Sequence, residues 1–189
     1  LELRPGVHPH AMSMVKELRG LIKKCPPIST KGDKFSLGGH IHIGGITSFV
    51  EERIPGELLE ALDAFIGIPT SWANGKARGK YGKLGQVEKK PYGFEYRSPS
   101  SAWVDNPKIA TLTLQFMWQL LVKACGKMGF EYEVYEIGSP KEEGIVKTPG
   151  LATIESFKSL HNGKTREDII EWLGFFREKR QTLTCNENW

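Results

Sequence analysis

The segment of residues 34–46 alternates between apolar and polar or small side chains with a period of two. One parity contains Phe35, Leu37, Ile41 and Ile43, and the other contains Ser36, Gly38, His40, His42 and Gly44. Successive side chains of a β-strand point to opposite faces of the sheet, so the pattern predicts a half-buried strand with both histidines on its polar face. The glycines and the serine beside the histidines leave room for a ligand to approach that face.

Two further segments carry charged residues at the same spacing, Glu2/Arg4 and Glu95/Arg97. In a strand, the two members of each pair project from one face. Carboxylates and imidazoles bind divalent cations, and arginines bind phosphate oxygens, so the three pairs together indicate a site for a metal and a nucleotide. Taken singly, each pair is equally compatible with an exposed strand face or a surface ion pair that adds little stability.

Apolar residues at helical spacing predict helices over residues 12–24, 55–65 and 107–128, and a last helix after a Thr165 cap. The second helix is expected to end at Gly67-Ile68-Pro69, and Asp105-Asn106-Pro107 is typical of an N-cap followed by a first-turn proline. Further strands are predicted over residues 94–97 and 130–137. Strands and helices do not alternate regularly, which favours an α+β domain built on a largely antiparallel sheet.

The length of 189 residues fits a single domain spanning residues 1–189. The chain begins without Met in the alternating sequence Leu1-Glu2-Leu3-Arg4, which is typical of the middle of a strand, so we expect its start to be cut from something longer. An apolar content of 39% excludes global disorder, and no apolar run approaches the roughly 18 residues of a membrane span. Three distant cysteines form no disulfide framework, so a reducing cytoplasm is expected.

Residues 75–93 combine five glycines with six lysines and arginines, which predicts a mobile basic loop. The net charge of only +4 argues against a dedicated nucleic-acid binder, although Tyr81 and Tyr92 with these lysines leave RNA binding as an alternative. A solvated linker is another. The Walker A pattern is absent from the sequence, which excludes a P-loop enzyme. Two histidines without a cysteine or a clear third imidazole make a weak zinc site, so magnesium or manganese is favoured.

Three motifs resemble those of the carboxylate-amine ligases, the amidoligases that phages often encode (phage COOH-NH2 ligase type 2). They are relatives of glutamine synthetase and glutamate-cysteine ligase. The motifs are Glu2-Leu3-Arg4-Pro5, the G-G-H-x-H sequence of residues 38–42, and Tyr81-Gly82-Lys83-Leu84-Gly85 followed by Glu95-Tyr96-Arg97. The resemblance covers about residues 1–104. It implies a glutamine synthetase-like fold, in which a curved, mainly antiparallel sheet carries helices packed on one face. Because the family usually has an earlier strand with further acidic ligands, the resemblance implies that this catalytic-type domain of residues 1–189 lacks one or more N-terminal strands.

The resemblance also implies roles for particular residues. The metal ligands would be Glu2, His40 and Glu95. The nucleotide would be bound by His42, Arg4 and Lys83. The catalytic residues would be Arg97 near the transferred phosphate, with Arg78 and Tyr81 in a loop that covers the substrate or the nucleotide. One position departs from the family, because Glu88 stands where a basic residue is expected, which weakens anion binding there.

The reaction that the resemblance implies uses ATP with Mg²⁺ or Mn²⁺ to activate a carboxylate as an acyl phosphate, which an amine then attacks to form an amide or peptide-like bond. The expected partners are the nucleotide and small-molecule or peptide substrates, and no membrane is expected to take part. The protein would act in the cytoplasm of a bacterial or phage-infected cell, and a homo-oligomer is compatible with the family. Two rival hypotheses remain. One is a non-catalytic phage structural or binding module that keeps the ligase fold, and the other is the RNA-binding domain, which predicts steep salt dependence.

Overall fold

The computed structural model describes residues 3–30, 37–44, 56–74, 82–125, 166–178 and 188–189. Its helices are α1 (Ala11–Lys24), α3 (Gly56–Leu62), α4 (Ile68–Ser71), α5 (Pro107–Cys125) and α7 (Arg166–Arg177), with a π-helical turn at Asp63–Gly67 and 3-10 turns at Trp72–Asn74 and Ser101–Val104. Its strands are β1 (Ile41–Gly44), β2 (Val87–Lys90) and β3 (Gly93–Tyr96). The described residues therefore have the predicted α+β class. We find no helix among them with the length and apolarity that a bilayer span requires.

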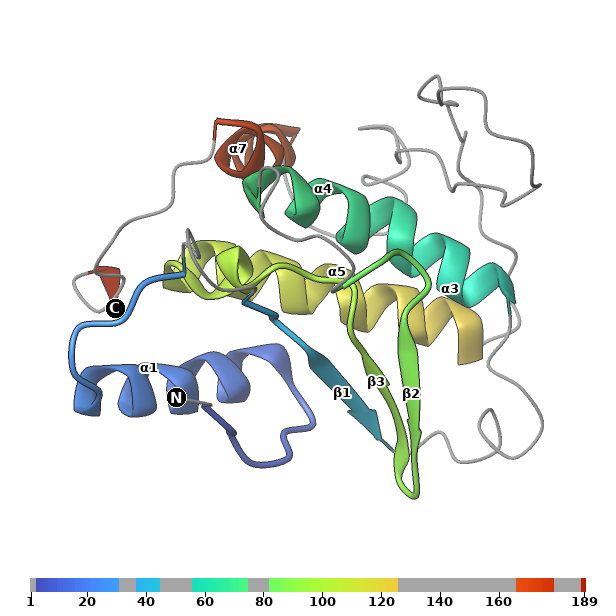
Figure 1. Ribbon diagram of the computed structural model, residues 1–189, viewed down its shortest axis with the longest axis horizontal. Coiled ribbons are helices and arrows are strands. Elements are labelled where there is room, and N and C mark those ends of the chain that lie inside the picture. Colours follow the sequence, from blue (N-terminus) through green and yellow to red (C-terminus); the bar gives the residue numbers. More distant parts are fainter. Residues whose placement is uncertain (1–2, 31–36, 45–55, 75–81, 126–165, 179–187) are drawn as a thin grey trace.

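The strands form an antiparallel sheet in the order β1-β3-β2, so β3 lies in the middle (Figure 1). Burial alternates along β1, where Ile41 and Ile43 are buried while His42 is exposed. This confirms the predicted parity of that strand. The predicted strand begins earlier, at residue 34, but residues 34–36 and 45–46 lie outside the described residues. Ahead of β1, Gly38 forms an isolated antiparallel bridge with Ser100.

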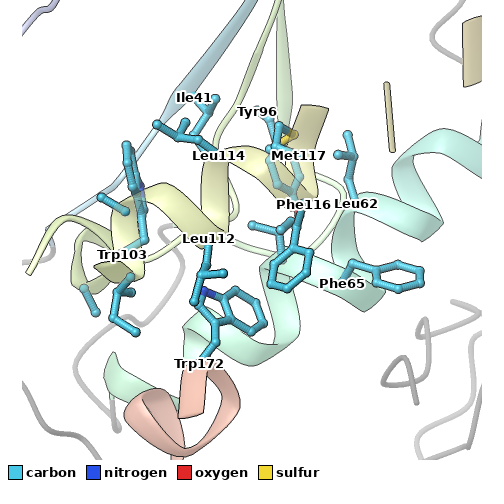
Figure 2. Close-up of a cluster of buried hydrophobic side chains, with 14 of the residues drawn as sticks. Ile41, Leu62, Phe65, Tyr96, Trp103, Leu112, Leu114, Phe116, Met117 and Trp172 are labelled. Carbon is cyan, nitrogen blue, oxygen red and sulfur yellow. The ribbon is translucent and has the colours of Figure 1, made fainter. Parts of the chain in front are cut away.

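The apolar face of the sheet shares one hydrophobic core with the helices. Figure 2 shows Ile41 and Tyr96 of the sheet near Leu114 of α5, with Trp172 of α7 reaching the same cluster from the other side. The Trp172 indole N–H donates to the Thr113 hydroxyl over 2.9 Å, so its one polar atom is satisfied inside the core. A fully buried large apolar side chain contributes about 1.5–3 kcal/mol, and α7 therefore stabilises the sheet-bearing part of the chain although it is distant in sequence.

Helices α1, α5 and α7 lie where the sequence predicts them. The N-cap of α5 is Asn106, whose side-chain oxygen accepts the Ile109 backbone N–H over 3.0 Å, and Pro107 occupies the first turn as expected. In α7, the predicted apolar positions are buried: Ile169, Trp172, Leu173 and Phe176. The Thr165 cap, the end of the third predicted helix at residue 128 and the strand predicted over residues 130–137 lie outside the described residues.

The predicted end of the second helix at Gly67-Ile68-Pro69 is wrong, because the helix continues to Ser71 through a π-helical turn. The Ile68 N–H bonds to the Asp63 carbonyl, five residues back, which widens the helix just before Pro69. Proline lacks an N–H and clashes with the preceding turn of a regular helix, and a wider turn accommodates both effects. Gly67 is required within this turn, since a Cβ there would lie 2.6 Å from the Tyr96 hydroxyl.

The predicted mobile loop of residues 75–93 is wrong for its second half, which forms a β-hairpin. Strand β2 pairs with β3 in the register Glu88↔Glu95, and the chain turns at Pro91 and Tyr92. The lysines and glycines predicted a loop from local composition alone. The hydrogen-bond ladder to β3 and the ion pair of Lys90 with Glu95 stabilise this strand from outside the segment. Residues 75–81 lie outside the described residues.

The Asp63 carboxylate is buried between the π-helical turn and the central strand. The Tyr96 hydroxyl donates to Asp63 Oδ1 over 2.6 Å, and the Gly85 backbone N–H also donates to this carboxylate. Burial raises the pKa of Asp63 to about 6, because the loss of hydration outweighs the hydrogen bonds that favour the charged form. The group therefore titrates in a mildly acidic range, above its ordinary value of 3.8.

This raised pKa predicts that Asp63 destabilises the fold as the pH rises. The folded state holds the proton more tightly than the unfolded state, so the group's contribution is most favourable below pH 4 and falls until the pH exceeds about 6. We expect the free energy of unfolding of the wild type, relative to that of Asp63→Asn, to decrease by up to about 3 kcal/mol between pH 4 and pH 7. Urea unfolding of both proteins at the two pH values measures this change, and a difference that stays constant or increases would contradict the prediction.

Candidate active site

The sheet face opposite to the core carries charged and imidazole side chains from all three strands. The register aligns His42, Glu95 and Glu88 in one row across the sheet. We call this surface the polar face, and it comprises His40, His42, Glu88, Lys90, Glu95 and Arg97. Its existence follows from strand geometry, because the neighbours of these residues in β1 and β3, among them Ile41 and Tyr96, point into the core.

Glu95 is the centre of the polar face and is only 6% exposed. Its Oε1 lies 2.6 Å from His40 Nδ1 and 3.6 Å from Arg97 Nε, and its Oε2 lies 3.1 Å from Lys90 Nζ. A buried carboxylate is costly unless it is paired, and here three basic side chains surround it. Glu95 therefore fixes the positions of groups that come from all three strands or their ends.

Glu88 forms a second carboxylate centre beside the first, at the more exposed edge of the polar face. Its oxygens lie 2.5 Å from Lys90 Nζ and 2.5 Å from Arg97 Nη1. The hydrogen bond from Lys90, reinforced by the charges of Lys90 and Arg97, lowers the pKa of Glu88. The hydrogen bonds of Lys90 to Glu88 and then to Glu95 raise the pKa of Lys90. Glu88, the acidic residue that departs from the family pattern, thus pairs with two cations and orients Arg97, which also contacts Glu95.

Lys83 lies on a segment that is fastened to the C-terminal end of β3. The Ser98 hydroxyl donates to the Lys83 carbonyl over 2.8 Å, and the Arg97 backbone N–H donates to the Gln86 carbonyl over 2.8 Å. Gly82 and Gly85 have positive φ angles of 67° and 70°, the conformation in which glycine is favoured over other residues. These turns place the exposed Lys83 next in space to the backbone that carries Arg97.

The other predicted site residues are placed less closely or lie outside the described residues. Arg4 is exposed on the segment ahead of α1, where the described residues Leu3 and Arg4 are not in the strand that we predicted. Glu2, Arg78 and Tyr81 lie outside the described residues. Sequence reasoning missed two contributors: Lys90 of the polar face, and Tyr92, whose hydroxyl is hydrogen-bonded to His42. Both depend on the β2–β3 hairpin, and Tyr92 could have been noticed only from the turn sequence Pro91-Tyr92-Gly93.

The polar face offers part of a donor set for a divalent cation. Within the described parts of the chain, no group of three or more His, Cys, Asp or Glu side chains is arranged to hold a metal ion. His40 and Glu95 supply two suitable donors in direct contact, and the third predicted ligand, Glu2, lies outside those parts. These two donors do not select a metal by themselves, because imidazole suits zinc whereas carboxylate oxygens suit magnesium or manganese.

A groove of about 790 Å³ lies elsewhere, between α1 and the N-terminal part of α5. Its wall includes Val15, Lys16, Lys108 and Leu112, and Asp168 of α7 also lines it. Lys108 is paired there with Glu171 at 2.6 Å. None of the residues of the polar face lines this groove, so the two surfaces are separate features of the molecule.

The family model of the phage phiEco32-like COOH.NH2 ligase-type 2 proteins matches residues 1–128. The chain therefore belongs to this family of carboxylate-amine ligases. The matched region includes every residue of the polar face and the whole of α5, whereas α7 lies beyond it. No match was found among curated proteins or among solved structures.

The two carboxylates of the polar face predict unequal losses of stability when each is neutralised. Glu95→Gln removes a buried charge and leaves Lys90 and Arg97 facing a neutral amide, so we expect a loss of about 3 kcal/mol in the free energy of unfolding. Glu88→Gln is the matched control, because solvent screens the same change at the exposed edge, and we expect a clearly smaller loss there than at Glu95. Urea unfolding at neutral pH measures both values. Losses of equal size would show that Glu95 does not organise the polar face.

Proposed function

We propose that this protein is an ATP- and Mg²⁺-dependent ligase that joins a carboxylate to an amine through an acyl phosphate, on a glutamine synthetase-like fold. The observation that carries the proposal is the buried Glu95, which gathers His40, Lys90 and Arg97 on one sheet face. Membership of the ligase family supports the reaction class. The substrates would be small-molecule or peptide carboxylates and amines, in the cytoplasm of the infected or bacterial cell, and the active protein could be a homo-oligomer.

The proposed reaction has two steps that balance in atoms and charge. An oxygen of the substrate carboxylate attacks the γ-phosphorus of ATP, the bond to the β-phosphate oxygen breaks, and ADP leaves. The amine nitrogen then attacks the carbonyl carbon, the phosphate leaves with its oxygen, and the nitrogen loses a proton to solvent or phosphate. Such chemistry requires positioning and charge stabilisation more than a nucleophile from the protein.

The side chains of the polar face suit these requirements. Arg97 is held by Glu88 and Glu95, so its guanidinium is oriented before any ligand binds and can stabilise charge on the transferred phosphoryl group. His40 and Glu95 would hold the divalent cation together with Glu2, and that cation would neutralise phosphate oxygens. His42, Lys83 and Arg4 would contact the nucleotide. Arg78 and Tyr81 would cover the substrate from the adjoining loop.

The proposal predicts an ATP-dependent condensation that can be measured without knowledge of the natural amine. Hydroxylamine traps acyl phosphates as hydroxamates, so the full chain with ATP, MgCl₂ and a panel of amino acids and peptides is expected to yield hydroxamate and ADP together. Glu95→Ala and Arg97→Ala are each expected to lower this rate at least about 100-fold, as the loss of a preorganised charge does elsewhere.

Lys89→Ala is the matched control for these variants. Lys89 lies on the same hairpin and is positively charged like Arg97. It is opposite Phe94 in the register, so its side chain leaves β2 on the other side from the polar face. We expect the Lys89→Ala protein to retain the wild-type rate. Wild-type activity in Glu95→Ala would contradict the proposal, and calorimetry that detects no MgATP binding to the wild type would favour the non-catalytic phage module instead.

A further inference from the structure

The hairpin turn between β2 and β3 reaches back across the sheet to touch β1. The Tyr92 hydroxyl lies 2.5 Å from His42 Nδ1, which is a hydrogen bond between residues fifty positions apart. The two ring centroids are 6.1 Å apart with an interplanar angle of 41°. Tyr92 is 44% exposed and His42 is exposed, so both rings border the solvent at one end of the polar face.

One glycine, Gly93, allows the turn to lie this close to β1. Gly93 has a φ of 151°, and a Cβ at that position would lie 2.0 Å from the Ile43 carbonyl oxygen. Gly44 faces the turn as well, but a Cβ there would be in ordinary van der Waals contact, 3.6 Å from the Tyr92 carbonyl oxygen and 3.7 Å from its Cδ2. The backbone is therefore in contact at the base of the turn, and this contact fixes the direction from which the Tyr92 side chain approaches His42.

The hydrogen bond to Nδ1 determines what the rest of the imidazole can do. In a neutral imidazole, one nitrogen is a donor and the other is an acceptor. When the tyrosine hydroxyl donates to Nδ1, the proton of the ring is placed on Nε2, which then becomes a hydrogen-bond donor. A donor at Nε2 matches the oxygens of a phosphate group, which only accept.

We propose that Tyr92 is a positioning residue that orients the His42 ring and holds it in the tautomer whose Nε2–H donates to a phosphate oxygen of the nucleotide. The inference rests on the proposed function, since it names how a bound nucleotide is recognised on the polar face. Tyr92 acts through His42 and not on the nucleotide itself. Its hydroxyl is the group that matters, and its ring serves to carry that hydroxyl across from the turn.

Tyr92→Phe tests the hydroxyl alone, because it keeps the ring and its packing. We expect isothermal titration with MgATP to give a Kd about five- to tenfold higher than that of the wild type, the usual effect of one such hydrogen bond. Tyr92→Leu is expected to weaken binding by the same factor, since it also lacks the hydroxyl. If Tyr92→Leu weakens binding while Tyr92→Phe does not, the ring and not the hydroxyl is responsible, and the proposal is overturned.

Two further measurements separate positioning from a general structural effect. In protein labelled with ¹⁵N-histidine at pH 8.5, the shifts of His42 are expected to indicate protonated Nε2 in the wild type and a mixture of tautomers in Tyr92→Phe. In a His42→Ala background, Tyr92→Phe is expected to leave the MgATP Kd unchanged, because the hydroxyl then has no imidazole to orient. An undiminished effect in that background would overturn the proposal.

Failure of this inference can be distinguished from failure of the proposed function. If the wild type binds MgATP and Tyr92→Phe binds it equally well with unchanged His42 shifts, only the positioning role of Tyr92 is overturned. If the wild type does not bind MgATP at all, the nucleotide site is absent, and the role of Tyr92 falls together with the proposed function.

Discussion

The hydrogen bond from the Tyr96 hydroxyl to the buried Asp63 carboxylate joins the helical layer to the central strand. Tyr96 points into the core, so its neighbours Glu95 and Arg97 point to the opposite face. The bond that holds Tyr96 against the helices therefore also fixes the backbone from which these two polar side chains extend. The same carboxylate accepts the Gly85 N–H, which fastens the segment that carries Lys83. The burial of this carboxylate, which raises its pKa, is the energetic cost of holding both Tyr96 and the segment around Gly85 in place.

Sequence reasoning identified the polar face because the alternation of side chains along a strand is a local property. His42 with Ile41, and Glu95 with Tyr96, could be assigned to opposite faces from their order alone. The β2–β3 hairpin and the π-helical turn could not be predicted in this way. Lys90 lies in a strand although the local composition favours a loop, because it pairs with Glu95 on the neighbouring strand. Pro69 is tolerated in a helix because the π-helical turn before it is wider than a regular turn.

The candidate site shows the same division between local and non-local information. Chemistry and spacing were sufficient to single out His40, Glu95 and Arg97, and the fold brings these three together. Glu88 and Tyr92 acquire their roles only through the register of the hairpin, which places one beside Arg97 and the other beside His42. The family match ends near α5, yet Trp172 of α7 is buried in the core beneath the sheet. A helix from outside the matched region therefore supports the surface on which the proposed chemistry would occur.

The close approach of Gly93 to the Ile43 carbonyl has a consequence for how this surface can diversify. Any side chain at position 93 would separate β3 from β1 and would break the alignment of His42 with Glu95. The distance between these two strands therefore cannot change without a change at Gly93. The outward-facing side chains of β2 can be replaced without moving the backbone. A substitution on the outward side of β2, such as one at Glu88, can therefore change the chemistry of the polar face, whereas the distance between β1 and β3 is fixed by the absence of a Cβ at Gly93.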